Sequence, residues 1–211
     1  IAVPMIFPPV RIGDEYFGDG AMRQATPLSP AVRLGADRIL VIGIRDETGG
    51  KPVHIADEPP SFAQIAGYML DTLLMDGLYS DLERITRVNE LLDAVPEGQR
   101  GESLSPMRPI DTMLIVPSED LHLIAHRHRG ELPVAIRMLL RGIGGNNPDE
   151  NRLLSFLLFE KAYTRELIAL GYRDAMKVKD ELRDFVSRAD VPRLFAPRWI
   201  KRDLSALNRD G

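Results

Sequence analysis

The residues best suited to chemistry in this sequence are Gly18-Asp19-Gly20-Ala21. Val10 to Ile12 and Glu15 to Phe17 predict a two-stranded hairpin with Gly13-Asp14 as its turn, so Asp19 follows a strand and precedes a helix. Glycines on both sides allow a tight turn that leaves the carboxylate open at the rim of a sheet, where catalytic groups often lie. An ordinary Asp-Gly turn is the alternative, because this dipeptide is common between elements.

The elements that would position this motif indicate an α/β fold. Thr26 and Pro27 predict the N-cap and the first residue of a helix, and Gly35 is expected just after its end. Arg38 to Ile44 is almost continuously apolar and predicts a strand buried on both faces of a layered sheet. Residues 110–116 form a second run of this kind. Residues 1–50 are thus expected to carry the hairpin, the Asp motif, one helix and one buried strand.

Residues 59–211 are expected to be mainly helical. Ser61 with Gln64 forms a capping-box pattern and Ser80 with Glu83 repeats it, so two successive helices are predicted before Pro96. Further helical patterns cover residues 121–128, 133–140, 148–163 and 165–186. No composition change divides the chain, and the whole of residues 1–211 is therefore expected to belong to a single α/β domain with a helix-rich C-terminal half.

Composition excludes several classes of protein. The chain has 211 residues and a net charge of −4, which provides no basic surface for nucleic acid. It contains no cysteine, so disulfide scaffolds, thiolate metal sites and thiol nucleophiles are excluded. No apolar run approaches 18 residues and no signal-peptide pattern is present, which favours a cytoplasmic protein.

A series of motifs stands in a fixed order between Ile6 and Ile44. The order is Phe7-Pro8-Pro9, the hairpin, Asp19-Gly20-Ala21, Pro27-Leu28-Ser29-Pro30-Ala31, Leu34-Gly35-Ala36-Asp37, and then the apolar strand. In residue type and in spacing, this series resembles the second half of the patatin-like phospholipase domain. The resemblance covers about forty of the 211 residues.

The resemblance implies an α/β/α layered sheet and a serine acyl hydrolase that works with a Ser–Asp dyad. Asp19 matches the dyad aspartate, with Gly18, Gly20 and Ala21 as its motif neighbours. Its implied role is to accept the serine proton while backbone N–H groups hold the oxyanion. The implied substrate is an acyl lipid, and no cofactor or metal is implied.

The sequence departs from this family at the nucleophile. Nine serines are present and none lies in a G-x-S-x-G elbow; the nearest imitation, around Ser103 and Ser105, lacks the second glycine. Since the chain also begins at Ile1 without Met, we expect it to be the C-terminal portion of a longer protein whose upstream half carries the serine. A non-catalytic lipid-binding or scaffold homologue of the same fold is the alternative.

Two histidines offer a weaker candidate site. His122 and His126 have the i, i+4 spacing of residues on one helix face, and Glu119 or Asp120 could add an oxygen ligand for a metal ion. The neighbouring Arg127 and Arg129 favour a solvated basic helix end instead, so no metal site is predicted.

The C-terminal tail combines cations with the one tryptophan of the chain. Arg193, Arg198, Trp199, Lys201 and Arg202 have a composition suited to peripheral contact with a membrane surface. Pro192 and Pro197 interrupt any long amphipathic helix, and a lone Trp is most often packed against its own protein. Docking of the tail onto the domain is therefore favoured over membrane contact.

Overall fold

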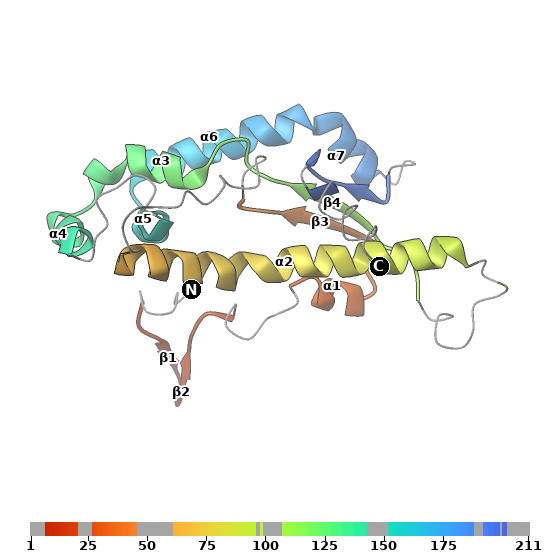
Figure 1. Cartoon of the computed structure of the whole chain (residues 1–211), viewed down its shortest axis with the longest axis horizontal. Coiled ribbons are helices and arrows are strands. Elements are labelled where there is room, and N and C mark those ends of the chain that lie inside the picture. Colours follow the sequence, from red (N-terminus) through yellow and green to blue (C-terminus); the bar gives the residue numbers. More distant parts are fainter. Residues whose placement is uncertain are drawn as a thin grey trace.

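The computed structural model describes residues 7–20, 27–45, 61–95, 98, 107–142, 152–187, 192–198 and 200–201. Over these residues the protein is a mixed α/β structure with two small sheets (Figure 1). None of the described helices is long and apolar enough to cross a membrane.

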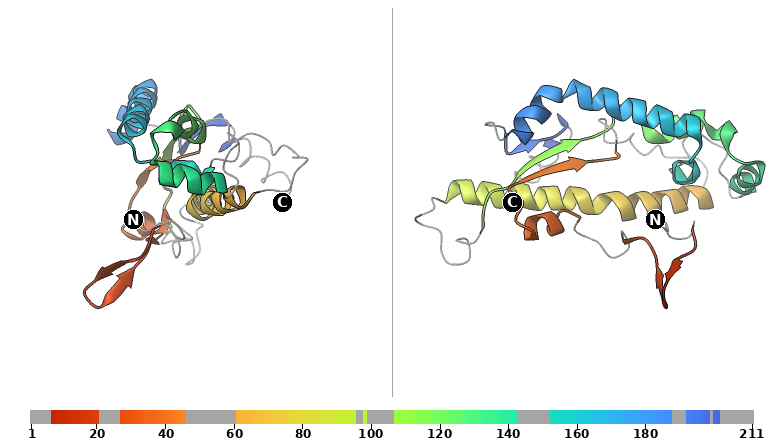
Figure 2. Two further views of the ribbon diagram at one scale, coloured as in Figure 1. Left: turned by 90° about the vertical axis from the view of Figure 1, so that its left-hand side faces the viewer. Right: turned by 180° about the vertical axis from the view of Figure 1, so that it is seen from behind.

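The predicted hairpin is confirmed. Strands β1 (Val10–Ile12) and β2 (Glu15–Phe17) pair antiparallel, with Ile12 opposite Glu15. Gly13 begins the two-residue turn at φ 64, a conformation that glycine adopts without strain and that hairpin turns of this length require. The hairpin projects away from the helices and the second sheet (Figures 1 and 2).

Helix α1 (Ser29–Arg33) is shorter than predicted. It begins two residues after Pro27, and its N-cap is Leu28, which supplies no side-chain hydrogen bond. The predicted cap, Thr26, lies outside the described residues. Leu28 is instead held by the carboxylate of Asp81, whose Oδ2 accepts a hydrogen bond from the Leu28 N–H at 3.0 Å. A contact 53 residues away in sequence therefore takes the place of a local cap.

The C-terminus of α1 follows the prediction. Gly35 has φ 94, as expected for the residue just beyond a helix end. The N–H of Gly35 donates to the Val32 carbonyl at 3.1 Å, and the N–H of Ala36 donates to the Ala31 carbonyl at 3.0 Å. This pair of bonds is a Schellman motif, which satisfies the last carbonyls of the helix and turns the chain into the next strand.

The second sheet is parallel and has the order β3 (Arg38–Ile42), β4 (Asp111–Ile115), β5 (Leu194–Phe195). Helices α6 and α7 lie over one face, and α2 runs along the other (Figures 1 and 2). The prediction that β3 is buried on both faces is wrong: Ile39 and Val41 are buried, whereas Leu40 is 44% and Ile42 77% exposed. An apolar run shows that both faces of a strand can be buried, but not that both are. Among the described residues β3 is the edge strand, and the face that carries Leu40 and Ile42 stays exposed.

Helix α2 (Phe62–Ala94) is one continuous element of 33 residues. Its capping box is confirmed, since Ser61 Oγ accepts from the Gln64 N–H at 3.2 Å and Gln64 Oε1 accepts from the Ser61 N–H at 2.6 Å. The prediction of a second helix starting at Ser80 is wrong, because Ser80 lies inside α2. A single interior glycine such as Gly77 lowers helix stability by only about 1 kcal/mol relative to alanine. Burial of Leu82, which lies beyond this glycine, stabilises the continuous helix.

The remaining helices surround this frame. They are α3 (Leu121–Arg127), the short 3-10 turn η3 (Arg129–Glu131), α4 (Val134–Gly142), α5 (Arg152–Leu157), α6 (Lys161–Lys177) and α7 (Lys179–Val186). The predicted boundary near residue 164 is wrong, because α6 runs through it. Glu160 has an extended backbone and caps α6, while Val178 separates α6 from α7. The helical periodicity of the sequence continues across Glu160 and Val178, so periodicity alone does not locate these two helix ends.

Two hydrophobic clusters share α2. The first joins Ala63 and Leu70 to α3, α4, α5 and α6, and the second joins Leu82 to β3 and β4. The tail belongs to the second cluster, where Ala196 and Ile200 are buried. Docking of this segment onto the domain, the favoured prediction, is confirmed at Ala196 and Ile200, whereas the cations Arg193, Arg198 and Lys201 are exposed. Trp199 and Arg202 lie outside the described residues.

Candidate functional site

Asp19 lies on the segment that leaves β2 and is half-buried. Neither Gly18 nor Gly20 has a positive φ, and a Cβ placed on either would meet no described atom within 4 Å. The described residues therefore give no steric reason for glycine at these two positions. Ala21, the last residue of the motif, lies outside the described residues.

The surface that carries Asp19 is apolar and open. Val10, Ile12, Tyr16 and Phe17 are all exposed, and they occupy both faces of the hairpin. Isolated exposed apolar residues are normal, but four within eight residues on a projecting hairpin form an apolar surface that the other described residues leave open. Asp19 therefore stands beside an uncovered apolar surface.

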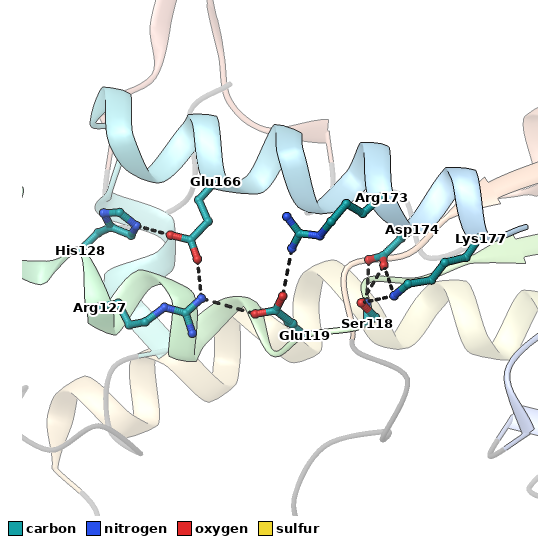
Figure 3. A network of polar contacts seen from close by, with 8 residues as sticks. All are labelled: Ser118, Glu119, Arg127, His128, Glu166, Arg173, Asp174 and Lys177. Atoms are coloured by element: carbon teal, nitrogen blue, oxygen red, sulfur yellow. Dashed lines mark hydrogen bonds and ion pairs between the residues drawn. The ribbon is translucent and has the colours of Figure 1, made fainter.

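A serine, an aspartate and a lysine meet at the carboxyl end of β4, and sequence patterns did not indicate them (Figure 3). Ser118 Oγ donates to Asp174 Oδ1 at 2.6 Å, and the Ser118 N–H donates to Asp174 Oδ2 at 2.8 Å. Lys177 Nζ donates to Ser118 Oγ at 3.0 Å and to Asp174 Oδ1 at 2.8 Å. Asp174 is buried on α6, so the cluster connects α6 to the turn between β4 and α3.

This cluster is better suited to holding the turn than to catalysis. Burial raises the pKa of Asp174, but the hydrogen bonds from Lys177 and Ser118 outweigh burial and leave the pKa below its ordinary value of 3.8. A carboxylate with a lowered pKa and three hydrogen bonds is a weak general base. The only local signal was a serine soon after a buried strand, since its partner lies 56 residues further along.

A second polar cluster joins α2, α3 and α5. Asp71 Oδ2 contacts Arg152 Nη1 at 2.5 Å and His122 Nε2 at 3.6 Å, and His122 Nδ1 lies 3.1 Å from Ser155 Oγ. Asp71 is buried, and its Oδ1 accepts no hydrogen bond from the described residues. Burial raises the pKa of Asp71, but hydrogen bonds from His122 and Arg152 outweigh it and leave the pKa below 3.8.

Aspartate, histidine and serine here resemble a nucleophilic triad only in composition. Ser155 lies within α5, and its hydroxyl donates to the Arg152 carbonyl at 2.8 Å, so its proton is directed into the helix. None of the three lines either of the two cavities described below. The cluster therefore connects three helices, and it gives His122 a partner other than the metal considered from sequence.

The other residues of that metal alternative are also engaged elsewhere. Asp120 caps α3, with Oδ1 accepting from the His122 N–H at 2.8 Å, and Glu119 pairs with Arg127 and Arg173. The described residues contain no group of three or more histidine or carboxylate side chains placed to hold a metal ion.

An ion-pair network connects α3 to α6 (Figure 3), and a contact of His128 extends it to η3. Glu166 pairs with Arg127 and with His128 Nε2, and His128 Nδ1 contacts Glu131 at 2.7 Å. The hydrogen bond that His128 donates to Glu131, followed by the one that it donates to Glu166, raises the pKa of His128 above its ordinary value of 6.5. Hydrogen bonds from His128 and Arg127 lower the pKa of Glu166 below 4.5.

Stability is expected to fall as pH rises through the raised pKa of His128. Below the pKa of His128 in the unfolded state, the charged imidazole makes its full contribution to stability. This contribution is lost when His128 of the folded protein is deprotonated at higher pH. Measurement of Tm from about pH 5.5 to about pH 8.5 should show a fall that His128→Gln abolishes. A double-mutant cycle with Glu166→Gln checks the partner. An unchanged pH profile in His128→Gln would contradict the assignment.

Comparisons with known protein families, with curated proteins and with solved structures found no match. The functional interpretation therefore depends on the residues of this chain and their geometry. Of the serines weighed from sequence, Ser103 and Ser105 lie outside the described residues.

Proposed function

We propose that the intact protein is a lipid acyl hydrolase of the patatin-like type, with Asp19 as one half of a Ser–Asp dyad. Its support is the sequence of elements around Asp19: hairpin, Asp motif, α1 ending in a Schellman turn at Gly35, and then β3 in a parallel sheet. The motifs that resemble the family fall on these elements in the same order.

One observation carries the second part of the proposal, that the serine comes from a segment upstream of this chain. Among the described residues, strand β3 is the edge of its sheet, and it exposes Leu40 and Ile42 on one face. An edge strand with an open apolar face is a position where further strands and helices pack. We propose that the upstream half extends the sheet beyond β3, covers the hairpin, and completes an α/β/α layering.

The proposed chemistry needs no cofactor. The serine oxygen attacks the ester carbonyl while Asp19 accepts the hydroxyl proton, and backbone N–H groups of the upstream half stabilise the oxyanion. The C–O bond to the alcohol then breaks, and the alcohol leaves with the proton from Asp19. Water attacks the acyl-serine, Asp19 accepts its proton and returns it to the serine oxygen, and the free acid is released.

A non-catalytic lipid-binding or scaffold protein remains the rival proposal. It retains the Asp motif for its turn and needs no nucleophile. A G-x-S-x-G sequence upstream of Ile1, between a strand and a helix, favours the enzyme, and its absence from the intact protein favours the rival.

Labelling with a fluorophosphonate tests the proposal directly. We expect residues 1–211 alone to remain unlabelled, because Asp19 has no nucleophile to activate, and the intact protein to be labelled at one upstream serine. Peptide mapping identifies the modified residue, and heat-denatured protein provides the background. Stoichiometric labelling of a serine within residues 1–211 would contradict the assignment, and Ser118 would be the first to examine because its hydroxyl contacts a carboxylate.

A further inference from the structure

A cavity of about 460 Å³ lies between α1, α2 and the segment before β4. Its wall is mainly apolar and is formed by Leu28, Val32, Ile85, Val88, Met107 and Ile110. The volume is in the lower part of the range of about 300–1,000 Å³ that is usual for small-molecule sites. Asp19 is not among the lining residues.

The two buried polar side chains in the wall are already satisfied by the protein. Asn89 Nδ2 donates to the Ile110 carbonyl at 2.8 Å, and Asn89 Oδ1 accepts from the Ile110 N–H at 2.9 Å. Asp81 accepts from the Leu28 N–H and pairs with Arg84 at 3.3 Å. The interior therefore presents apolar surface without unmet polar groups, which suits a hydrocarbon chain.

Three arginines line the same cavity. Arg84 is 66% exposed beside Asp81, and Arg108, half-exposed, pairs with Asp37 at 3.1 Å. A Cβ on Gly35 would lie 3.3 Å from Arg108 Nη2, so the glycine leaves room for this guanidinium. Arg33 is exposed at the end of α1 and forms no ion pair with any described residue. Among the described residues, these three guanidiniums face two carboxylates, those of Asp81 and Asp37, which leaves one positive charge.

We infer that this cavity binds a free fatty acid, with the acyl chain against the apolar wall and the carboxylate at the arginines. Charge complementarity selects the occupant: one uncompensated guanidinium matches one carboxylate, and its planar fork binds carboxylate oxygens in pairs. A zwitterionic lysolipid carries a positively charged group in its head group, which the uncompensated arginine at the cavity would repel. The cavity suits a single-chain ligand. This inference stands on the cavity alone and does not require the proposed catalysis, although a fatty acid is also the acid which that reaction releases.

The other cleft, of about 380 Å³ beside Asp174, does not support the same inference as well. Its lysine, Lys177, is already paired with Asp174 at 2.8 Å, and the hydroxyl of Ser118, which does not line the cleft, is bonded to both. Arg198 lines that cleft, but it is the sole further cation among the described lining residues.

Calorimetric titration of the full-length protein with sodium dodecanoate, below its micelle concentration, tests the inference. We expect one site per chain. Arg33→Glu should raise Kd at least about tenfold, since it removes a charge-assisted hydrogen bond and brings a like charge to the carboxylate. Val88→Trp, which fills the cavity without changing charge, should remove binding. Arg165→Glu on α6 is the matched charge control, because Arg165 is exposed and lines neither cavity, and it should leave Kd within about twofold.

The head group is tested with 1-dodecanol and a twelve-carbon lysophosphatidylcholine. Both should bind more weakly than dodecanoate and should not respond to Arg33→Glu as dodecanoate does. Equal or tighter binding of either ligand would overturn the carboxylate assignment, as would dodecanoate binding that neither Arg33→Glu nor Val88→Trp weakens. Melting curves verify that Val88→Trp folds; if it does not, the exposed Arg33→Glu still decides the outcome. Asp19→Asn should leave dodecanoate affinity unchanged, so failure of the catalytic proposal and failure of this inference are separate results.

Discussion

Replacement of Asp19 by Asn in the intact protein is expected to lower kcat for a soluble ester by roughly 10² to 10⁴, with Tm unchanged. Asparagine has nearly the size of aspartate and is equally compatible with a turn, so the backbone after β2 should be preserved. Its amide cannot accept the serine proton. The proposed dyad contains no histidine to take over that role, and the loss should therefore be near the upper end of the range.

Asp14 provides a matched control for this substitution. It lies in the turn of the same hairpin, its side chain is fully exposed, and its partner is Arg11 at 3.3 Å. Asp14→Asn makes the same chemical change five positions away, and we expect turnover to remain near the wild-type value. Near-normal turnover of Asp19→Asn in a protein that melts normally would overturn the dyad, whereas a collapsed Tm would show that Asp19 is chiefly structural.

Features set by neighbouring residues were predictable from the sequence. The β1–β2 hairpin follows from a two-residue turn that begins with glycine, and the start of α2 follows from the reciprocal bonds of Ser61 and Gln64. Ser80 and Glu83 show the limit of such patterns. A capping box forms only where the N-cap residue leaves the helical conformation, and packing of Leu82 keeps α2 continuous through that point.

Features that depend on distant segments were not predictable. An apolar run at β3 does not specify which face of the strand another segment covers, and the described residues leave the face with Leu40 and Ile42 exposed. The Asp174 cluster joins α6 to the turn after β4, with Ser118 lying 56 residues from Asp174 in sequence. The Asp71 cluster joins three helices, with Arg152 lying 81 residues from Asp71. No local spacing encodes such contacts. The position of Asp19 after a strand was predictable because it is local, whereas the serine of the proposed dyad would come from another segment.

Substitution of Gly67 by alanine is the second change with a large expected effect. Gly67 is buried in α2 where α5 crosses it, and a Cβ there would lie 2.7 Å from Arg152 Cβ and 3.0 Å from the Leu153 backbone nitrogen. Neither atom belongs to the end of a flexible side chain, so the two helices must separate. Overpacking of this kind costs about 1–3 kcal/mol, and separation also weakens the Arg152–Asp71 ion pair. We expect this loss to exceed the gain in helix propensity, about 1 kcal/mol.

Gly171 on α6 separates the packing effect from helix propensity. A Cβ on Gly171 would meet no described atom within 4 Å, and the residue is exposed in the interior of a 17-residue helix. Gly171→Ala should therefore raise the free energy of unfolding by up to about 1 kcal/mol, while Gly67→Ala lowers it. Urea denaturation of both variants and the wild type measures the two changes under the same conditions. Stabilisation by both substitutions would show that α2 and α5 do not approach as closely at Gly67 as described, and the polar cluster that depends on this crossing would have to be reassigned.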